Sequence, residues 1–88
     1  MPIIFYELGA AGDDNGWRHF VSDQLSVSIR ERDGRYLIEI ERHDKRRPDD
    51  GDVAAAFARF IPNSHKMIPV WGGMKGEAVR RYRTADAE

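Results

Sequence analysis

Residues 25–42 read LSVSIRERDGRYLIEIER, two runs of alternating apolar and polar residues on either side of Asp33-Gly34. An Asp-Gly pair readily adopts the positive φ angles of a two-residue type I′ turn, whose twist matches that of two antiparallel strands. Alternation with a period of two is typical of strands that bury one face. The sequence therefore predicts a β-hairpin over residues 25–42.

A two-residue turn also determines the register of this hairpin. It places Arg32 opposite Arg35, and counting back gives the pairs Glu31–Tyr36, Ile29–Ile38 and Val27–Ile40. One face then collects Leu25, Val27, Ile29, Tyr36, Ile38 and Ile40, and the other collects Ser26, Ser28, Arg30, Glu39 and Glu41. A slip of one residue would turn the whole apolar set to water, so we expect this register to be kept.

The apolar face of the hairpin needs a cover, and residues 53–61, VAAAFARFI, have the pattern of a helix that could supply it. Its apolar stripe consists of Val53, Phe57, Phe60 and Ile61. We expect Asp50 or Asp52 to cap the start of this helix and Pro62 to end it.

Two further stretches have the composition of strands. Residues 2–8, PIIFYEL, carry apolar side chains on both alternating faces, which predicts a strand covered on both sides. Residues 17–24 fit either a helix or a strand, and we favour a short strand.

The C-terminal part of the chain predicts one strand and one helix. Residues 66–71, KMIPVW, resemble a strand that Pro69 restricts to a sheet edge, because proline donates no ladder hydrogen bond. Residues 74–83 have the spacing of a short C-terminal helix, weakened by Gly76. Its inward side would carry Met74, Ala78, Val79 and Tyr82.

The chain has 88 residues, which is the size of one domain with one core. We therefore expect residues 1–88 to form a single compact α+β domain, with residues 84–88 frayed. We expect a small antiparallel sheet of three to five strands, with the 25–42 hairpin at its centre and the 53–61 helix on its apolar face.

Composition limits the functions open to this protein. It contains no cysteine, which rules out disulfides and thiolate nucleophiles and favours a reducing cytoplasm. Its 14 basic and 15 acidic residues leave a net charge of −1, without the global field of a dedicated nucleic-acid binder. No apolar run approaches the roughly 20 residues that span a bilayer.

The motifs favour a protein without catalytic activity. His19, His43 and His65 lie in separate segments without the spacing of a zinc hydrolase, and no G-x-S-x-G nucleophile elbow occurs. The loop GAAGDDNG, residues 9–16, has neither the Lys-Ser/Thr of a Walker loop nor the ligand spacing of a calcium loop. We therefore expect no metal site and no cofactor, and a small enzyme subunit is the least favoured alternative.

The favoured function is protein binding. The connector of residues 43–52, HDKRRPDDGD, places a basic cluster beside an acidic one, and Trp71 precedes Gly72-Gly73. An aromatic anchor with a charged rim is typical of protein interfaces. The predicted contacts with a protein partner are Trp71, Arg46, Arg47, Asp49 and Asp50.

Nucleic-acid binding is the main alternative. Its candidate residues are Lys45, Arg46, Arg47, Arg80, Arg81 and Arg83. On a C-terminal helix, Arg80 and Arg83 would share one side and Arg81 would lie away from it. This function requires both basic groups on one surface with the neighbouring aspartates turned away, and the near-neutral net charge counts against it.

In size, absence of cysteine, mixed charge and α+β pattern, the chain resembles the small proteins that phages encode to block host machinery, including anti-CRISPR proteins. The resemblance is one of type and transfers no residue. It implies an inhibitor that acts on another protein. Separately, the edge at residues 66–71 could pair with its own copy and form a homodimer.

Overall fold

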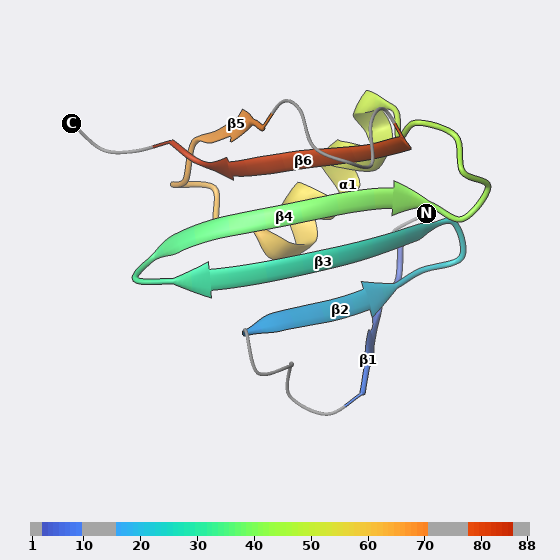
Figure 1. The fold of residues 1–88 in the computed structure, drawn as a ribbon, viewed down its shortest axis with the longest axis horizontal. Coiled ribbons are helices and arrows are strands. Elements are labelled where there is room, and N and C mark those ends of the chain that lie inside the picture. Colours follow the sequence, from blue (N-terminus) through green and yellow to red (C-terminus); the bar gives the residue numbers. More distant parts are fainter. Residues whose placement is uncertain (1–2, 10–15, 71–77, 86–88) are drawn as a thin grey trace.

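The computed structural model describes residues 3–9, 16–70 and 78–85 of the chain. These residues form one antiparallel sheet and one helix (Figure 1). The strands are β1 (Tyr6–Leu8), β2 (Trp17–Val21), β3 (Leu25–Arg32), β4 (Arg35–Arg42), β5 (Met67–Pro69) and β6 (Val79–Thr84). The helix, α1 (Asp50–Phe60), lies against one face of the sheet, whose strand order is β1-β2-β3-β4-β6-β5.

The central hairpin of β3 and β4 confirms the predicted register. Arg32 pairs with Arg35, and the pairs Ile29–Ile38 and Val27–Ile40 follow. Asp33 and Gly34 both have positive φ, at 52° and 79°. These angles are those of a type I′ turn, so the turn and the face pattern select the same pairing.

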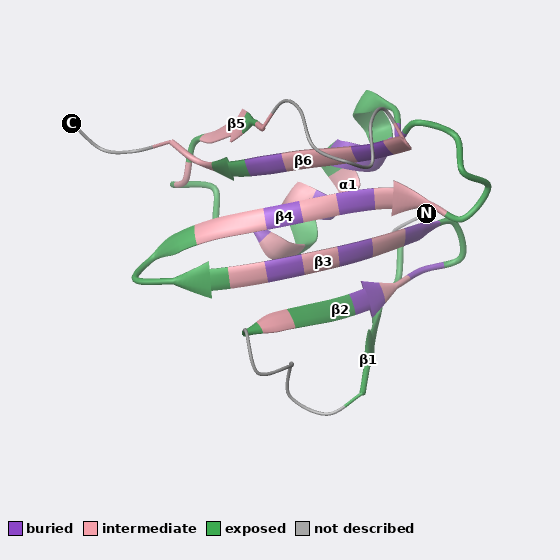
Figure 2. Ribbon diagram, viewed as in Figure 1, coloured by how far each residue is buried: buried purple, intermediate pink, exposed green. Residues whose placement is uncertain are grey.

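The apolar face of the hairpin packs under α1 and forms the centre of the core. Leu25, Ile38 and Ile40 are completely buried. Figure 2 shows the expected alternation, with buried and partly exposed positions following one another along β3 and β4. Around this centre, the Phe60 ring contacts the rings of Phe5 and Phe20, at centroid distances of 5.0 and 4.6 Å.

The helix begins earlier than predicted, and a different residue caps it. Asp49, rather than Asp50 or Asp52, is the N-cap: its Oδ1 accepts a 2.8 Å hydrogen bond from the Asp52 amide. The Asp52 carboxylate accepts a 3.0 Å bond from the Asp49 amide in return. This reciprocal capping box requires residues three apart, and only the Asp49–Asp52 pair has that spacing.

The sheet has six strands, so the predicted three to five was too few. The missing strand is β6, where a C-terminal helix was predicted wrongly. Residues 79–83 pair with β4 along its outer edge, from Glu41–Val79 to Leu37–Arg83. Without β6 the central strand β4 would leave its backbone groups unpaired on that side, and this tertiary pairing outweighs local helix preference.

The two edge strands are β1 and β5. The 17–24 stretch forms β2 as favoured, and β5 with Pro69 lies at an edge as expected. The prediction that residues 2–8 are covered on both sides was wrong, because Tyr6 is 64 % and Leu8 53 % exposed. Within the residues that the structure describes, no helix is long and apolar enough to cross a membrane.

The connector after β4 is held by one arginine. Arg42 donates hydrogen bonds of 3.0 and 2.8 Å to the two carboxylate oxygens of Asp44, and a third of 3.1 Å to Asp52. The Arg42 side chain and the Arg46 amide both donate hydrogen bonds to the Asp44 carboxylate. The pKa of Asp44 therefore lies well below its ordinary value. Arg42 thereby ties the end of the hairpin to the start of α1.

Replacing Ile38 with Ala should lower the free energy of unfolding by about 2–5 kcal/mol, because it leaves a cavity in the covered core. Leu37→Ala is the matched control, since Leu37 is the next residue on the same strand and lies on the opposite, partly exposed face. Denaturant unfolding should show a much smaller loss for Leu37→Ala. Equal losses would contradict the assignment of the buried face.

Arg42→Gln should raise the pKa of Asp44 toward its ordinary value, although the Arg46 amide bond keeps part of the shift. A carboxyl group whose pKa is lower in the folded than in the unfolded state stabilises the fold at pH values above its unfolded-state pKa. This stabilisation is lost as the pH falls through the folded-state pKa. The Asp44 contribution should therefore persist to lower pH in the wild type than in Arg42→Gln. NMR titration of the Asp44 carboxyl carbon would measure this, and identical titration curves would contradict it.

Candidate functional site

The face of the sheet opposite α1, here called the open face, has no helix over it in the described part of the chain (Figure 1). Side chains directly opposite each other in antiparallel strands point to the same side. The pairing therefore places one row of side chains across five strands of the open face. This row consists of Trp17, Arg30, Leu37, Arg83 and Ile68.

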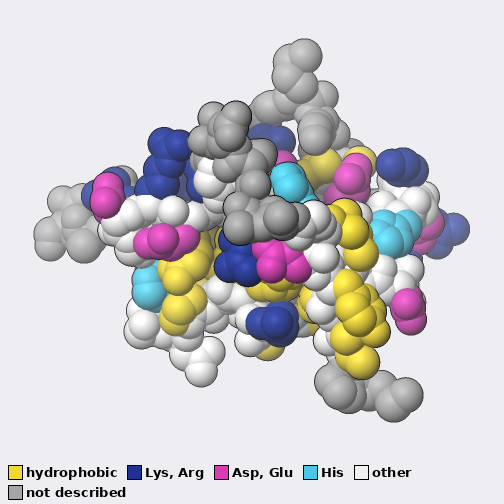
Figure 3. All heavy atoms as spheres, turned by 90° about the horizontal axis from the view of Figure 1, so that it is seen from below, with side chains coloured by type: hydrophobic (Ala, Val, Ile, Leu, Met, Phe, Trp, Pro, Cys, Tyr) yellow, Lys and Arg dark blue, Asp and Glu magenta, His cyan; other side chains and the backbone are white. Residues whose placement is uncertain are grey.

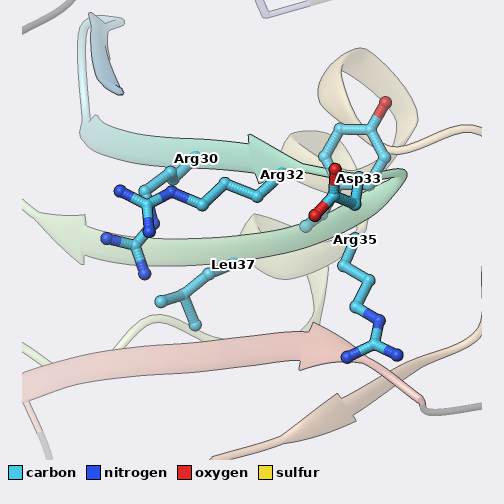
Figure 4. A pocket seen from close by; sticks show the side chains of 6 residues that line it. Arg30, Arg32, Asp33, Arg35 and Leu37 are labelled. Atoms are coloured by element: carbon cyan, nitrogen blue, oxygen red, sulfur yellow. The ribbon is translucent and has the colours of Figure 1, made fainter. Parts of the chain in front are cut away.

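Three arginines gather where this face meets the hairpin turn, and we call Arg30, Arg32 and Arg35 the arginine end. Together with Asp33, Tyr36 and Leu37 they line a depression of about 440 Å³. Figure 4 shows the Arg30 and Arg32 side chains extending side by side across β4 with adjacent guanidinium groups. Arg35 extends the other way, toward β6, and Leu37 points outward beside the pair.

Two of the charges at the arginine end, those of Arg30 and Arg32, lie side by side (Figure 4). Arg32 lies directly opposite Arg35, a cross-strand pairing of like charges that is unfavourable by itself. The Arg30 guanidinium lies 5.0 Å from the centre of the Trp17 ring. No carboxylate of the described residues lies within ion-pairing distance of Arg30.

This arrangement suits a planar anion. A guanidinium group presents parallel N–H donors that match the two oxygens of a carboxylate, and it gives up its hydration more readily than an ammonium group. Asp33 lies at the turn, on the far side of the depression from the Arg30 and Arg32 guanidiniums (Figure 4). An incoming anion would therefore meet two adjacent cations beside an apolar side chain, Leu37.

Beyond the arginine end, the open face carries charges of both signs. Glu39 lies 2.9 Å from the Nε of Arg81, in the same cross-strand pair. The geometry of this contact is that of an ion pair rather than a hydrogen bond, because the buried Nε has no hydrogen-bond partner among the described residues. Ser28 and Ser26 hydrogen bond to His19 and His43, at 2.9 and 3.0 Å.

The C-terminal arginines predicted for nucleic acid do not form one surface. Arg80 lies on the helix side, where its Nη1 contacts Asp50 at 3.0 Å and the Pro48 carbonyl at 3.2 Å. Arg81 and Arg83 lie on the open face, so the strand reverses the helical grouping of Arg80 with Arg83. Of the three, Arg83 is the exposed one.

The connector residues lie apart from the arginine end. Lys45, Arg46 and Arg47 are exposed beyond the opposite end of the hairpin, and the Arg46 amide binds Asp44 at 3.0 Å. Asp49 is the N-cap of α1, and Asp50 pairs with Arg80.

Some predicted features fall outside the described residues. Trp71 is one, and most of the 9–16 loop, residues 10–15, is another. Among the described residues, no group of histidine and carboxylate side chains has the arrangement of a metal site.

Sequence reasoning missed the arginine end, although part of its signal was available. The hairpin register already placed Arg30 on the polar face and Arg32 opposite Arg35. The contact of Trp17 with Arg30 comes from a strand whose pairing partner the sequence did not specify.

Comparison with known proteins gives no match: no family model, no curated protein and no solved structure is significantly similar to this chain.

Glu39→Gln should lower the free energy of unfolding by about 1–3 kcal/mol, because it leaves the half-buried Arg81 without its counter-charge. Glu41→Gln, two residues along the same face, is the matched control and should change stability by less than about 0.5 kcal/mol. Chemical denaturation of both variants would measure this. If both were neutral, Arg81 would not need its partner in the fold and would be available for binding.

Proposed function

We propose that the protein is a non-catalytic binding module that recognises an acidic surface of another protein through the arginine end of its open face. The observation that carries this proposal is the pair of adjacent guanidinium groups of Arg30 and Arg32, beside Leu37 (Figure 4). Two adjacent guanidinium groups present several N–H donors to the same anionic group, and charge-assisted hydrogen bonds of this kind are strong. Arginine and tryptophan are also the residues that concentrate binding energy at interfaces.

A protein partner fits the open face better than a nucleic acid does. Beyond the arginine end the open face carries both signs, with the Glu39–Arg81 ion pair, Glu41 and Arg83. A nucleic-acid backbone is negative throughout and would meet these carboxylates, whereas a protein surface can present both signs. The Trp17 ring contacts Arg30, which makes it part of the rim of the site rather than a free stacking platform.

Inhibition is the mode of action that we propose for this binding. A module of this size acts by occupying a surface of its partner, as do the small phage-encoded inhibitors, including anti-CRISPR proteins, that the chain resembles in type. The cytoplasm is the proposed location, because a cysteine-free composition suits a reducing compartment. The acidic surface would belong to a component of the host cell.

A photo-cross-linking amino acid at position 37 tests this proposal in the cell that produces the protein. Leu37 lies on the open face beside the arginine end, so we expect a cross-linked adduct with a protein that resists nuclease. The same probe at Ala58, exposed on α1, is the positional control and should give no such adduct. Arg30→Glu combined with Arg32→Glu should abolish the adduct at position 37.

Arg46→Glu combined with Arg47→Glu is the matched charge control, because it reverses two arginines on the connector instead. This variant should keep the adduct. An adduct that nuclease destroys, together with steeply salt-dependent binding of mixed-sequence oligonucleotides, would replace the protein-binding proposal with the nucleic-acid alternative.

A further inference from the structure

The exposed large hydrophobic residues of the described chain are all found in one short segment, at and just before β1. They are Ile3, Ile4, Tyr6 and Leu8, with exposed fractions of 43, 63, 64 and 53 %. Figure 3 views the molecule from this edge and shows hydrophobic side chains gathered beside a central group of charged ones. Single exposed hydrophobic residues are common, but a run of four in six residues indicates an interaction surface.

The segment is also a sheet edge. β1 has β2 as its one neighbour, so the backbone groups on its other side have no strand partner in the described chain. Natural edge strands are usually protected by proline, lysine or a covering element. The opposite edge follows this rule: β5 contains Pro69, which has no N–H, and is preceded by the exposed Lys66. β1, by contrast, contains neither proline nor lysine.

We propose that β1 pairs antiparallel with β1 of a second copy of this chain, which makes the protein a homodimer with one continuous sheet. A second copy suits this edge because the same apolar alternation, Ile4, Tyr6 and Leu8, complements itself about a two-fold axis. This dimer uses the edge opposite the one at residues 66–71. The proposal is independent of the function proposed for the arginine end.

Charge excludes one register of this pairing, and the apolar residues favour another. If Glu7 faced its own copy, two carboxylates would lie directly opposite each other, which is unfavourable. With Tyr6 on the two-fold axis, Ile4 lies opposite Leu8 of the partner subunit, and all three apolar residues find apolar neighbours. Glu7 then stays in its own chain's ion pair, where Arg18 donates two hydrogen bonds of 2.8 Å and lowers its pKa.

The geometry of the dimer has a consequence for binding. The two-fold axis of an antiparallel strand pair runs perpendicular to the sheet, so both open faces lie on the same side. The dimer therefore presents two arginine ends to a common partner surface. Two linked sites bind a repeated or symmetric target more tightly than one, without any new contact.

Sedimentation of the full chain over a range of concentrations tests the proposal. We expect a monomer–dimer equilibrium in the wild type and loss of the dimer in Leu8→Lys, which places a charge in the interface. Ile68→Lys is the matched control, because Ile68 is on the open face of the opposite edge strand and should keep the dimer. Circular dichroism melting would show that both variants are folded.

A cysteine substitution tests the register, since the natural chain contains no cysteine. Tyr6→Cys should form a disulfide between two copies under mild oxidation, because residues on the axis come within disulfide reach. Ala54→Cys, exposed on α1, should not form one. Three results would overturn the proposal: a wild type that is monomeric throughout, a dimer lost in Ile68→Lys but kept in Leu8→Lys, or a dimer in which Tyr6→Cys does not cross-link.

Discussion

The type I′ turn at Asp33-Gly34 sets the pairing of β3 with β4, and nearly every other feature of the structure is positioned from that pairing. It brings Leu25, Ile38 and Ile40 to one face, where they become the most deeply buried side chains of the core. Because side chains alternate between the two faces of a strand, the same register places Arg30 and Leu37 on the other face. A shift of one residue would exchange the two faces, so the core and the proposed binding surface depend on a single geometric constraint.

The number and length of the helices explain why the second face has no helix over it in the described part of the chain. An α1 of 11 residues is about 16 Å long, whereas six strands spaced about 4.8 Å apart make a sheet about 24 Å wide. One such helix covers the centre of one face, and the other face carries charged residues interspersed with apolar ones such as Leu37 and Ile68. This face, which has no helix over it in the described part of the chain, carries the adjacent guanidinium groups of the proposed binding site.

The short length of α1 also accounts for the difference in exposure between the two edges of the sheet. β6 covers the outer side of β4, and β5 closes that half with a proline-containing strand. On the other half, β1 lies at the margin of the helix-covered area, where Phe5 contacts the core through Phe60 and the residues on either side of it are exposed. The apolar surface that a second helix would bury in a larger domain is therefore exposed in this one, and it is the surface proposed for association.

The sequence by itself determined the elements whose signals are local. The Asp-Gly turn, the alternation of 25–42, the apolar stripe that predicted α1 and the Pro69 edge strand all follow from neighbouring residues, and the structure contains each of them. The helix cap could also have been found, because a capping box requires two residues three apart and Asp49–Asp52 fits. Arg32 opposite Arg35 was implied by the register.

Tertiary structure alone decided what depends on residues far apart in the chain. Residues 79–84 have apolar spacing that suits a helix, yet they form β6 because β4 offers a row of backbone groups that must be paired. That strand sends Arg80 to Asp50 and Arg81 to Glu39, which removes both from the basic surface predicted for them. Strand order likewise places Trp17 beside Arg30 and exposes Tyr6 and Leu8 at an edge. Sequence periodicity indicates which side of a helix or strand is apolar. Which element packs against that side depends on the strand pairing and on the position of the helix over the whole sheet.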